Sequence, residues 1–311
     1  MTPMSELPVP VLVGPTASGK SGLAVDLALA LAERGRPAEI VNADSMLVYR
    51  GMDIGTAKPT VDERRGVRHH LIDIMDVTET ASVATFQGMA RETIADCRAR
   101  GVIPIVVGGS ALYSRAVTDE FDFPGTDPKI RAAWEAELER VGPEALHAEL
   151  ARREPAAAEQ VLPGNGRRIV RALEVIDLTG SFVAHLPRLV YALRGVVQIG
   201  LDLERDVLDE RIEMRVDQMW ADGLVDEVRR LIPEGLREGR TASRALGYRQ
   251  VLEFLAGECT EKDARDATVT QTRRFARKQL GWYRRDERIT WIPALADDRV
   301  DRALEICAAD D

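Results

Sequence analysis

The sequence of 311 residues predicts an α/β protein, a parallel sheet flanked by helices, with a small all-helical insertion. Apolar runs at residues 9–13 and 102–107, and a strand-like run at residues 196–201, alternate with helical segments, as buried parallel strands do. From about residue 120, prolines interrupt short, charged, alanine-rich helical pieces. We therefore expect a core formed by residues 1–119 and 192–311, and a helical insertion at residues 120–191.

A glycine-rich loop follows the first strand and leads into the first helix. The loop consists of Gly14, Pro15, Thr16, Ala17, Ser18, Gly19, Lys20 and Ser21. Its spacing is that of a P-loop, in which backbone N–H groups and the helix dipole surround a phosphate. The Lys20 ammonium adds a mobile charge, and the Ser21 hydroxyl can hold Mg²⁺. The loop predicts a polyphosphate site in a P-loop NTPase-like core.

The second strand, residues 39–43, ends at Asp44 and Ser45. Because the carboxyl ends of parallel strands meet at one edge of a sheet, we expect Asp44 to lie near the bound phosphates. A turn or helix-capping role for this aspartate is the alternative. The glycine-rich stretch at residues 49–59 has no clean periodicity and reads as a functional loop.

A further strand is expected at residues 71–74, and a helix at residues 82–100. The buried strand at residues 102–107 stops at Gly108, Gly109 and Ser110, a second turn that offers N–H groups and a hydroxyl to the same edge. His69 and His70 are adjacent and lack metal-ligand spacing, so a structural role is favoured for both.

The insertion is expected to contain helices at residues 129–140, 143–153 and 167–175. The last of these carries Arg167, Arg168 and Arg171 near its start, where cations oppose the helix dipole. An anionic partner for these side chains is therefore predicted.

The second half of the chain combines basic and aromatic residues. One long amphipathic helix is expected at residues 206–232, with Arg211 and Arg215 on the same face. Residues 265–288 contain eight Lys or Arg and three acids, interleaved with aromatic side chains. Such mixing suits contact with phosphates and stacking on bases.

Bulk properties narrow the class of protein. The formal net charge of −9 argues against non-specific coating of nucleic acid. The three cysteines are far apart and suggest neither disulfides nor a zinc site. The first residues lack a signal peptide, and the longest apolar stretch is too short to span a bilayer. We expect a cytoplasmic protein that is not bound to a membrane.

Several stretches together resemble the tRNA dimethylallyltransferases, also called tRNA isopentenyltransferases. The resemblance extends from residue 14 to about residue 291. It is most specific at residues 51–59 and at residues 245–250, because a P-loop alone is shared by many families. The other matching stretches are the P-loop, Asp44 with Ser45, residues 107–109 with Leu112 and Tyr113, residues 168–175, Arg244, and residues 273–282.

This resemblance implies transfer of a dimethylallyl group from dimethylallyl diphosphate to N6 of adenine 37, beside the anticodon of a tRNA. Asp44 would be the general base, since the amino group is a poor nucleophile unless its proton is removed. Lys20, Ser110 and Arg215 would act on the diphosphate, with Mg²⁺ on Ser21 as the cofactor. Whether Arg211 or Arg215 contacts the diphosphate stays open.

The resemblance also implies contact with the tRNA anticodon stem-loop, and we expect the protein to act as a monomer. The residues that match RNA-contacting positions are Asp44, Ser45, Met46, Leu47, Ser110, Arg131, Arg167, Arg168, Ile169, Val170, Arg171, Arg244, Ala245, Leu246, Gly247, Tyr248 and Arg249.

The chain departs from the family pattern at Ser110, where threonine is usual and the hydroxyl is kept, and at residues 46–48 and 81–83. Two other functions are consistent with part of the sequence. A small-molecule kinase using ATP explains the P-loop and Asp44 equally well, but not the basic second half. A nucleotide-switched RNA-binding protein would need a guanine-reading Asn-Lys-x-Asp motif, which the sequence lacks.

Overall fold

The computed structural model describes residues 7–121, 123–182 and 189–308. Residues 1–6, which lack the pattern of a signal peptide, lie outside these ranges. The chain divides into two compact units, a core unit of residues 1–119 and 191–311 and an insertion unit of residues 120–190.

The core unit is built on a six-stranded sheet in the order β3-β2-β4-β1-β5-β6, and every neighbouring pair is parallel. This arrangement confirms the predicted α/β class with a P-loop-like sheet. The central strand β1 lies between β4 and β5, so the loop that follows it emerges at the middle of one sheet edge. The strands are β1 (Val9–Val13), β2 (Ala38–Asn42), β3 (His69–His70), β4 (Ile103–Val107), β5 (Val196–Asp202) and β6 (Ile289–Pro293).

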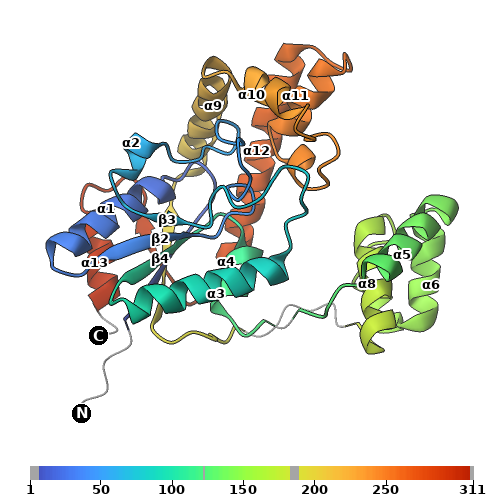
Figure 1. Cartoon of the computed structure of the whole chain (residues 1–311), viewed down its shortest axis with the longest axis horizontal. Coiled ribbons are helices and arrows are strands. Elements are labelled where there is room, and N and C mark those ends of the chain that lie inside the picture. The colour runs from blue at the N-terminus through green and yellow to red at the C-terminus, as the bar shows by residue number, and fades with distance from the viewer. Residues whose placement is uncertain (1–6, 122, 183–188, 309–311) are drawn as a thin grey trace. The chain divides into compact units, whose positions relative to one another are not determined.

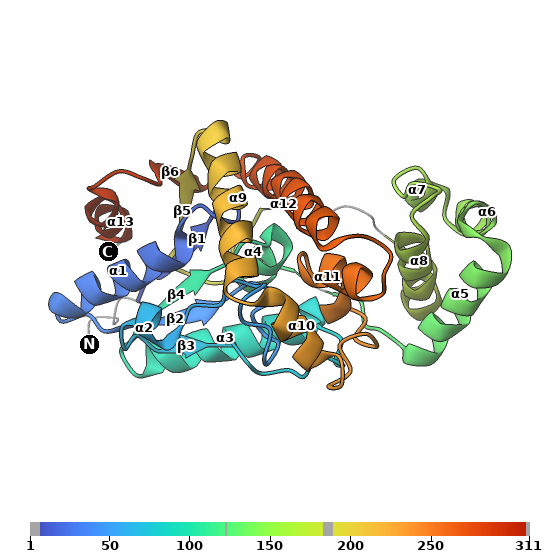
Figure 2. The same ribbon diagram turned by 90° about the horizontal axis from the view of Figure 1, so that it is seen from above.

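Helices cover both faces of the sheet because successive strand residues point to opposite sides. Leu12 and Ile105 pack with α1 (Lys20–Glu33) and α13 (Arg299–Ala308) in one hydrophobic core. Val11 and Val106 belong to a second core, with side chains of α3 (Val83–Ala99) and α4 (Ala111–Thr118). Figures 1 and 2 show α1 and α13 on one side of the sheet and α3 on the other.

The expected strand at residues 71–74 is absent, and β3 consists of His69 and His70 instead. Leu71 (φ 61°) and Asp73 (φ 55°) adopt left-handed backbone conformations, which an extended strand cannot contain. The chain therefore leaves the sheet one residue after β3.

The expected long helix at residues 206–232 is two helices, α9 (Arg205–Ala221) and α10 (Leu224–Leu231). Gly223, with φ 97°, lies between them in the left-handed region, where a helix ends. The direction of the chain changes at this glycine. The apolar side chains of α9 and those of α10 therefore pack against different neighbours.

The remaining helices of the core unit extend beyond the sheet. The long helix α12 (Glu261–Tyr283) packs against both α9 and α11 (Tyr248–Leu255), and Figure 2 shows α9 and α12 side by side. The other two helices of this group are α2 (Val61–Arg64) and the 3₁₀ helix η1 (Ala242–Arg244). Among the described residues, no helix is both long and apolar enough to cross a bilayer.

The insertion unit has a hydrophobic core of its own, which includes Leu146, Leu150, Ile169 and Leu173. Three of its helices start with a proline, a residue suited to the first turn of a helix because no partner for its missing N–H is needed there. The helices are α5 (Pro128–Val141), α6 (Pro143–Arg153), α7 (Pro155–Ala158) and α8 (Gly166–Thr179).

Candidate active site

The P-loop borders a cavity of about 770 Å³ in the core unit. Three of the residues that shape the loop lie in the left-handed half of the Ramachandran map: Gly14 (φ 144°), Ala17 (φ 63°) and Gly19 (φ 94°). A Cβ atom at Gly14 would approach the carbonyl oxygen of Leu201 to 3.2 Å, so a side chain there would press on β5. Both φ and space therefore require glycine at the start of the loop.

Lys20 lies at the first position of α1 and lines the cavity. Its Nζ donates to the carbonyl oxygen of Pro15 at 2.6 Å. Burial and the nearby Arg215 charge lower the pKa of Lys20 to about 7, although Asp44 acts to raise it. An anion in the cavity would favour the charged form of this lysine.

Asp44 lines the same cavity, as the sequence predicted from its place after β2. Asn42 fixes this turn: its Oδ1 accepts from the Asp44 N–H at 2.8 Å, and its Nδ2 donates to the Asp44 carbonyl oxygen at 2.9 Å. The Asp44 Oδ1 accepts from the N–H of Met46. Burial raises the pKa of Asp44, against the opposite effects of the Met46 N–H and the Lys20 charge.

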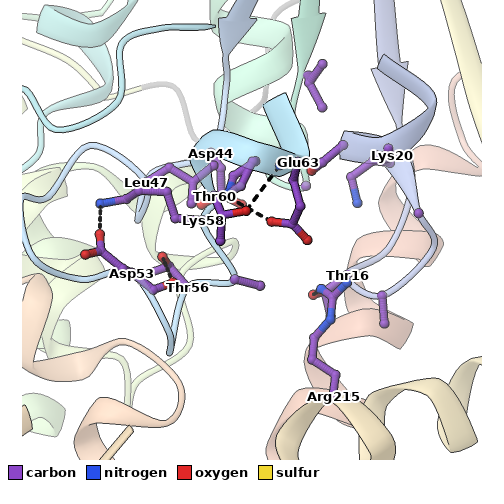
Figure 3. A pocket seen from close by; sticks show the side chains of 18 of the residues that line it. Thr16, Lys20, Asp44, Leu47, Asp53, Thr56, Lys58, Thr60, Glu63 and Arg215 are labelled. Atoms are coloured by element: carbon purple, nitrogen blue, oxygen red, sulfur yellow. Dashed lines mark hydrogen bonds and ion pairs between the residues drawn. The ribbon is translucent and has the colours of Figure 1, made fainter. Parts of the chain in front are cut away.

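The two arginines of α9 meet the P-loop in different ways. Arg215 lines the cavity, and its Nη1 lies 3.4 Å from Oγ1 of Thr16. Arg211 Nε donates to the carbonyl oxygen of Ala17 at 2.9 Å, at the residue with positive φ. In Figure 3, Lys20, Thr16 and Arg215 gather on one side of the cavity. This geometry favours Arg215 as the residue that faces a ligand and Arg211 as a support of the loop.

The turn after β4 brings Gly108 and Gly109 to the cavity, whereas Ser110 is not among the residues that line it. Ser110 is the residue before α4, and its carbonyl oxygen accepts from the N–H and hydroxyl of Ser114. At Gly108 a Cβ atom would lie 2.4 Å from the carbonyl oxygen of Ala43. The segments that follow β2 and β4 are therefore so close at this point that only glycine fits.

Gln279 of α12 joins the two glycine turns, a residue whose role the sequence did not reveal. Its Oε1 accepts from the N–H of Thr16 at 2.9 Å, and its Nε2 donates to the carbonyl oxygen of Gly109 at 2.5 Å. Gln279 is buried and shares one helix face with Ala276 and Tyr283. The signal in the sequence that could have revealed this role is a polar residue on an otherwise apolar helix face.

The loop at residues 51–59 forms the opposite side of the cavity, where Figure 3 shows Lys58, Asp53 and Thr56. Lys58 is buried and donates to the Tyr49 carbonyl oxygen and to the carboxylates of Asp53 and Asp73. This ammonium therefore stabilises the loop through buried contacts, and its charge is neutralised by two carboxylates.

Oxygen donors for a hard cation are present around the cavity. Ser21 is exposed and lines this cavity, with its hydroxyl as the oxygen donor. Hydroxyl and carboxylate oxygens are ligands that Mg²⁺ accepts, together with water and phosphate oxygens. The residues at the cavity therefore fit the expected Mg²⁺.

The residues predicted to contact RNA in the core unit separate into exposed and buried sets. Arg244 and Arg249 are exposed. Ala245 and Tyr248 are buried in the hydrophobic core, so their side chains have little surface for RNA in this structure. Arg249 donates to Oε1 of Gln271.

The insertion unit shows a similar separation. Arg167 and Arg168 are exposed, whereas Ile169 and Val170 are buried in the core of the unit and have little surface for RNA. The anion that Arg171 meets is Glu174 of the same helix, at 2.8 Å. Arg131 donates to the same carboxylate through Nε and Nη2, so it too has a partner inside the unit.

His70 lies beside Glu39 and Cys97, a grouping that the sequence spacing did not suggest. Its Nε2 is 2.7 Å from Oε2 of Glu39. Arg100 pairs with both oxygens of Glu39 and lies 3.4 Å from the Cys97 sulfur. The arginine supplies the cation for this cluster, which agrees with the structural role predicted for His70.

A P-loop after β1, an aspartate after β2 and an arginine from α9 thus surround one cavity at the carboxyl edge of a parallel sheet. These features define a P-loop-like α/β protein.

Comparisons with known proteins are more specific. Residues 47–286 match the family model described as IPP transferase. The chain is 61% identical over 298 residues to a tRNA dimethylallyltransferase of Cutibacterium acnes, covering 96% of this chain and 93% of that protein. It is 62% identical to the protein of that name in Thermobifida fusca, covering 95% and 92%. The chain therefore belongs to the IPP transferase family, the family of the tRNA dimethylallyltransferases, and is a transferase.

Solved structures agree with this assignment. The tRNA isopentenylpyrophosphate transferase of Bacillus halodurans has a TM-score of 0.69 and 40% identity, covering 96% of this chain and 94% of that one. A eukaryotic dimethylallyltransferase, described as acting on tRNA, has a TM-score of 0.80 and 25% identity, covering 98% and 79%. The resemblance inferred from the motifs is confirmed.

Proposed function

We propose that this protein transfers a dimethylallyl group from dimethylallyl diphosphate to N6 of adenine 37 in tRNA. The observation that carries the proposal is the meeting of Asp44, Lys20 and Arg215 at one cavity. A carboxylate and two cations are the groups that such a transfer requires, one for the proton of the amine and two for the leaving pyrophosphate.

In the proposed reaction, N6 of adenine forms a bond to C1 of the dimethylallyl group. The bond between C1 and the diphosphate oxygen breaks, and pyrophosphate leaves with its electron pair. Lys20, Arg215 and the N–H groups of the P-loop stabilise the charge that develops on pyrophosphate. The P-loop thus holds a leaving group, in contrast to the phosphoryl transfer for which this loop is often used.

Asp44 accepts the proton that N6 loses. Its position is fixed by Asn42 and by the Met46 N–H, so the carboxylate does not need to reorganise during the reaction. Burial raises the pKa of Asp44 and so makes it a stronger base than an exposed aspartate.

Mg²⁺, when bound to the diphosphate, would neutralise part of its charge. Ser21 would hold the ion through its hydroxyl, which is exposed at the cavity. Ser110 would donate to the diphosphate, which requires its hydroxyl to turn toward the cavity that the neighbouring Gly109 already lines.

We further propose that exposed arginines contact the anticodon stem-loop, namely Arg244 and Arg249 of the core unit and Arg167 and Arg168 of the insertion unit. Adenine 37 must leave its stack to reach Asp44. The protein would act in the cytoplasm, where tRNA is present, and as a monomer.

The test is incubation of the protein and Mg²⁺ with an unmodified tRNA anticodon stem-loop and radiolabelled dimethylallyl diphosphate. A parallel reaction contains radiolabelled ATP in place of the prenyl donor. We expect label in the RNA from the first reaction only, and N6-dimethylallyladenosine after nuclease digestion. An RNA in which adenine 37 is replaced by guanine is the control. ATP consumption that depends on a small hydroxyl compound, with no prenylated RNA, would support the kinase instead.

A further inference from the structure

A buried glutamate without a role in the proposed chemistry lies directly behind the loop that borders the cavity. Glu227 is on α10 and is 1% exposed. It shares the buried face of the helix with Leu224, Val228 and Leu231. A carboxylate among apolar side chains is costly unless hydrogen bonds satisfy it, so its partners indicate its purpose.

Three of these partners are consecutive backbone N–H groups of the cavity loop. Glu227 Oε2 accepts from Asp53 at 3.1 Å and from Ile54 at 2.8 Å. Its Oε1 accepts from Gly55 at 3.2 Å. The carboxylate therefore fixes the backbone of residues 53–55 from outside the cavity, while Lys58 holds the loop from within.

The fourth partner is Tyr248, whose hydroxyl donates to Glu227 Oε1 at 2.5 Å. Tyr248 is fully buried, and burial together with the Glu227 charge raises its pKa well above the ordinary value. The phenol thus stays protonated as a donor. A Cβ atom at Gly55 would lie 2.5 Å from the Tyr248 ring, so the loop and the ring are in direct contact.

These contacts connect two parts of the sequence with different expected roles. Asp53, Ile54 and Thr56 line the cavity. Tyr248 is the first residue of α11, directly before the exposed Arg249. One carboxylate thus joins the wall of the small-substrate cavity to the start of a helix that carries a proposed RNA contact.

We propose that Glu227 is a positioning residue for dimethylallyl diphosphate, and that Tyr248 acts through it. This inference rests on the proposed function. Glu227 sets the backbone at residues 53–55, and that backbone sets the cavity wall against which the small substrate binds.

The test compares Glu227→Gln, Tyr248→Phe and the double variant with the wild-type full-length protein. In Glu227→Gln, the amide NH₂ replaces one of two oxygens that only accept, so at least one backbone N–H of the loop loses its partner. Each lost hydrogen bond is worth roughly a fivefold to tenfold change in an equilibrium constant. We expect KM for dimethylallyl diphosphate to rise by about that factor, with KM for the tRNA stem-loop unchanged.

Tyr248→Phe should raise the same KM by a smaller factor. Because Tyr248 acts through Glu227, the double variant should have the KM of Glu227→Gln alone, within about twofold. Asp226→Asn is the matched control, since Asp226 is the adjacent acid on α10, is exposed and pairs with Arg229 at the surface. It should leave both KM values unchanged.

Binding of inorganic pyrophosphate, measured by calorimetry, separates the two proposals. If the wild-type protein binds pyrophosphate but does not prenylate RNA, the proposed function fails, and Glu227→Gln should still weaken this binding. If the wild-type protein prenylates RNA and Glu227→Gln only lowers the melting temperature, with KM and pyrophosphate binding unchanged, Glu227 is structural and the positioning role is wrong. Should Glu227→Gln fail to fold, Tyr248→Phe decides by the same readouts.

Discussion

At the scale of single residues, the site depends on side chains whose backbone is fixed by a neighbour. Asn42 holds Asp44 through two hydrogen bonds, and Arg211 holds the P-loop at Ala17. Asp44 and Arg215 are thereby left facing the cavity. The distinction between supporting and reacting residues leads to three predictions.

Asp44→Asn should lower the rate of prenyl transfer by about 10²-fold or more, the usual contribution of a general base. The asparagine Oδ1 can still accept from the Met46 N–H, so the turn should persist. Pyrophosphate binding should therefore stay within about twofold of the wild-type value. Loss of pyrophosphate binding would instead make Asp44 a structural residue or a metal ligand. The measurements are single-turnover transfer and calorimetry.

The pH profile of the wild-type protein tests the same residue. Only the ionised carboxylate accepts a proton, so kcat/KM should fall as the pH drops through the pKa of Asp44. Because burial raises that pKa above its ordinary value of 3.8, the acid limb should lie above pH 3.8. An acid limb at or below that value would contradict the role of Asp44 as base.

Arg215→Ala should weaken pyrophosphate binding by about 10-fold to 100-fold, because hydrogen bonds to charged groups are worth about 1.5–3 kcal/mol. Arg211→Ala removes a contact to the loop carbonyl of Ala17 and should weaken binding by about fivefold at most. Calorimetric titration of both variants measures this difference. If Arg211→Ala weakened pyrophosphate binding more than Arg215→Ala, the contact with the ligand would belong to Arg211.

At the scale of elements, α12 joins parts of the site that are far apart in sequence. Its residue Gln279 bonds to the P-loop at Thr16 and to the turn after β4 at Gly109. Phe275, one turn earlier on the helix, lines the cavity. Movement of this helix would therefore alter the P-loop and the glycine turn together.

Gln279→Leu should weaken pyrophosphate binding by about fivefold or more, since it leaves the Thr16 N–H and the Gly109 carbonyl oxygen without partners, and each such loss costs about 1–3 kcal/mol. Gln271→Leu is the same change two turns earlier on α12, where the amide meets Arg249 and Gln250 instead. The control should bind pyrophosphate normally. Equal weakening in both variants would indicate a general effect on the helix.

At the scale of the whole molecule, each unit contains a buried glutamate that gathers hydrogen bonds from distant segments. Glu227 does so in the core unit, and Glu174 in the insertion unit. Glu174 accepts from Thr126, Asp127, Arg131 and Arg171. Burial acts to raise the pKa of Glu174, but the hydrogen bonds from Arg131, Thr126 and Arg171 outweigh it and lower the pKa to about 2.

Glu174→Gln should destabilise the insertion unit by about 1–3 kcal/mol at pH 7, because the partners of the carboxylate are left without an anion. The pKa of Glu174 in the folded protein lies below its ordinary value of 4.5, so this contribution is present above about pH 4.5 and is lost as the pH falls toward 2. The difference in stability between variant and wild type should therefore shrink as the pH falls from about 4.5 toward 2.

Hydrogen exchange of the α5 and α8 amides in the full-length protein measures this effect within the unit. Glu137→Gln is the control, since its pair with Arg140 lies at the surface and such pairs contribute about 0–1 kcal/mol. If the control destabilises the unit as much as Glu174→Gln does, the hydrogen bonds to the buried Glu174 carboxylate stabilise the unit no more than a surface ion pair.

Much of the fold was predictable from local patterns. The apolar runs gave β1, β2, β4 and β5 to within a residue or two, since a buried parallel strand is apolar on both faces. The two errors occurred where the backbone turns at positive φ, at Leu71 with Asp73 and at Gly223. Apolar periodicity does not report such turns, because it reflects which side chains are buried and not the direction of the chain.

The sequence by itself determined the P-loop, the place of Asp44 after its strand and the family, because these depend on residues close together in the chain. Only the tertiary structure decided which arginine faces the cavity, that Arg131 and Arg171 meet Glu174, and that Gln279 and Glu227 support the site. Gln279 contacts a residue 263 positions away, and Glu227 contacts residues 172 to 174 positions away. Such pairings arise from the packing of helices onto the sheet, which no local pattern in the chain encodes.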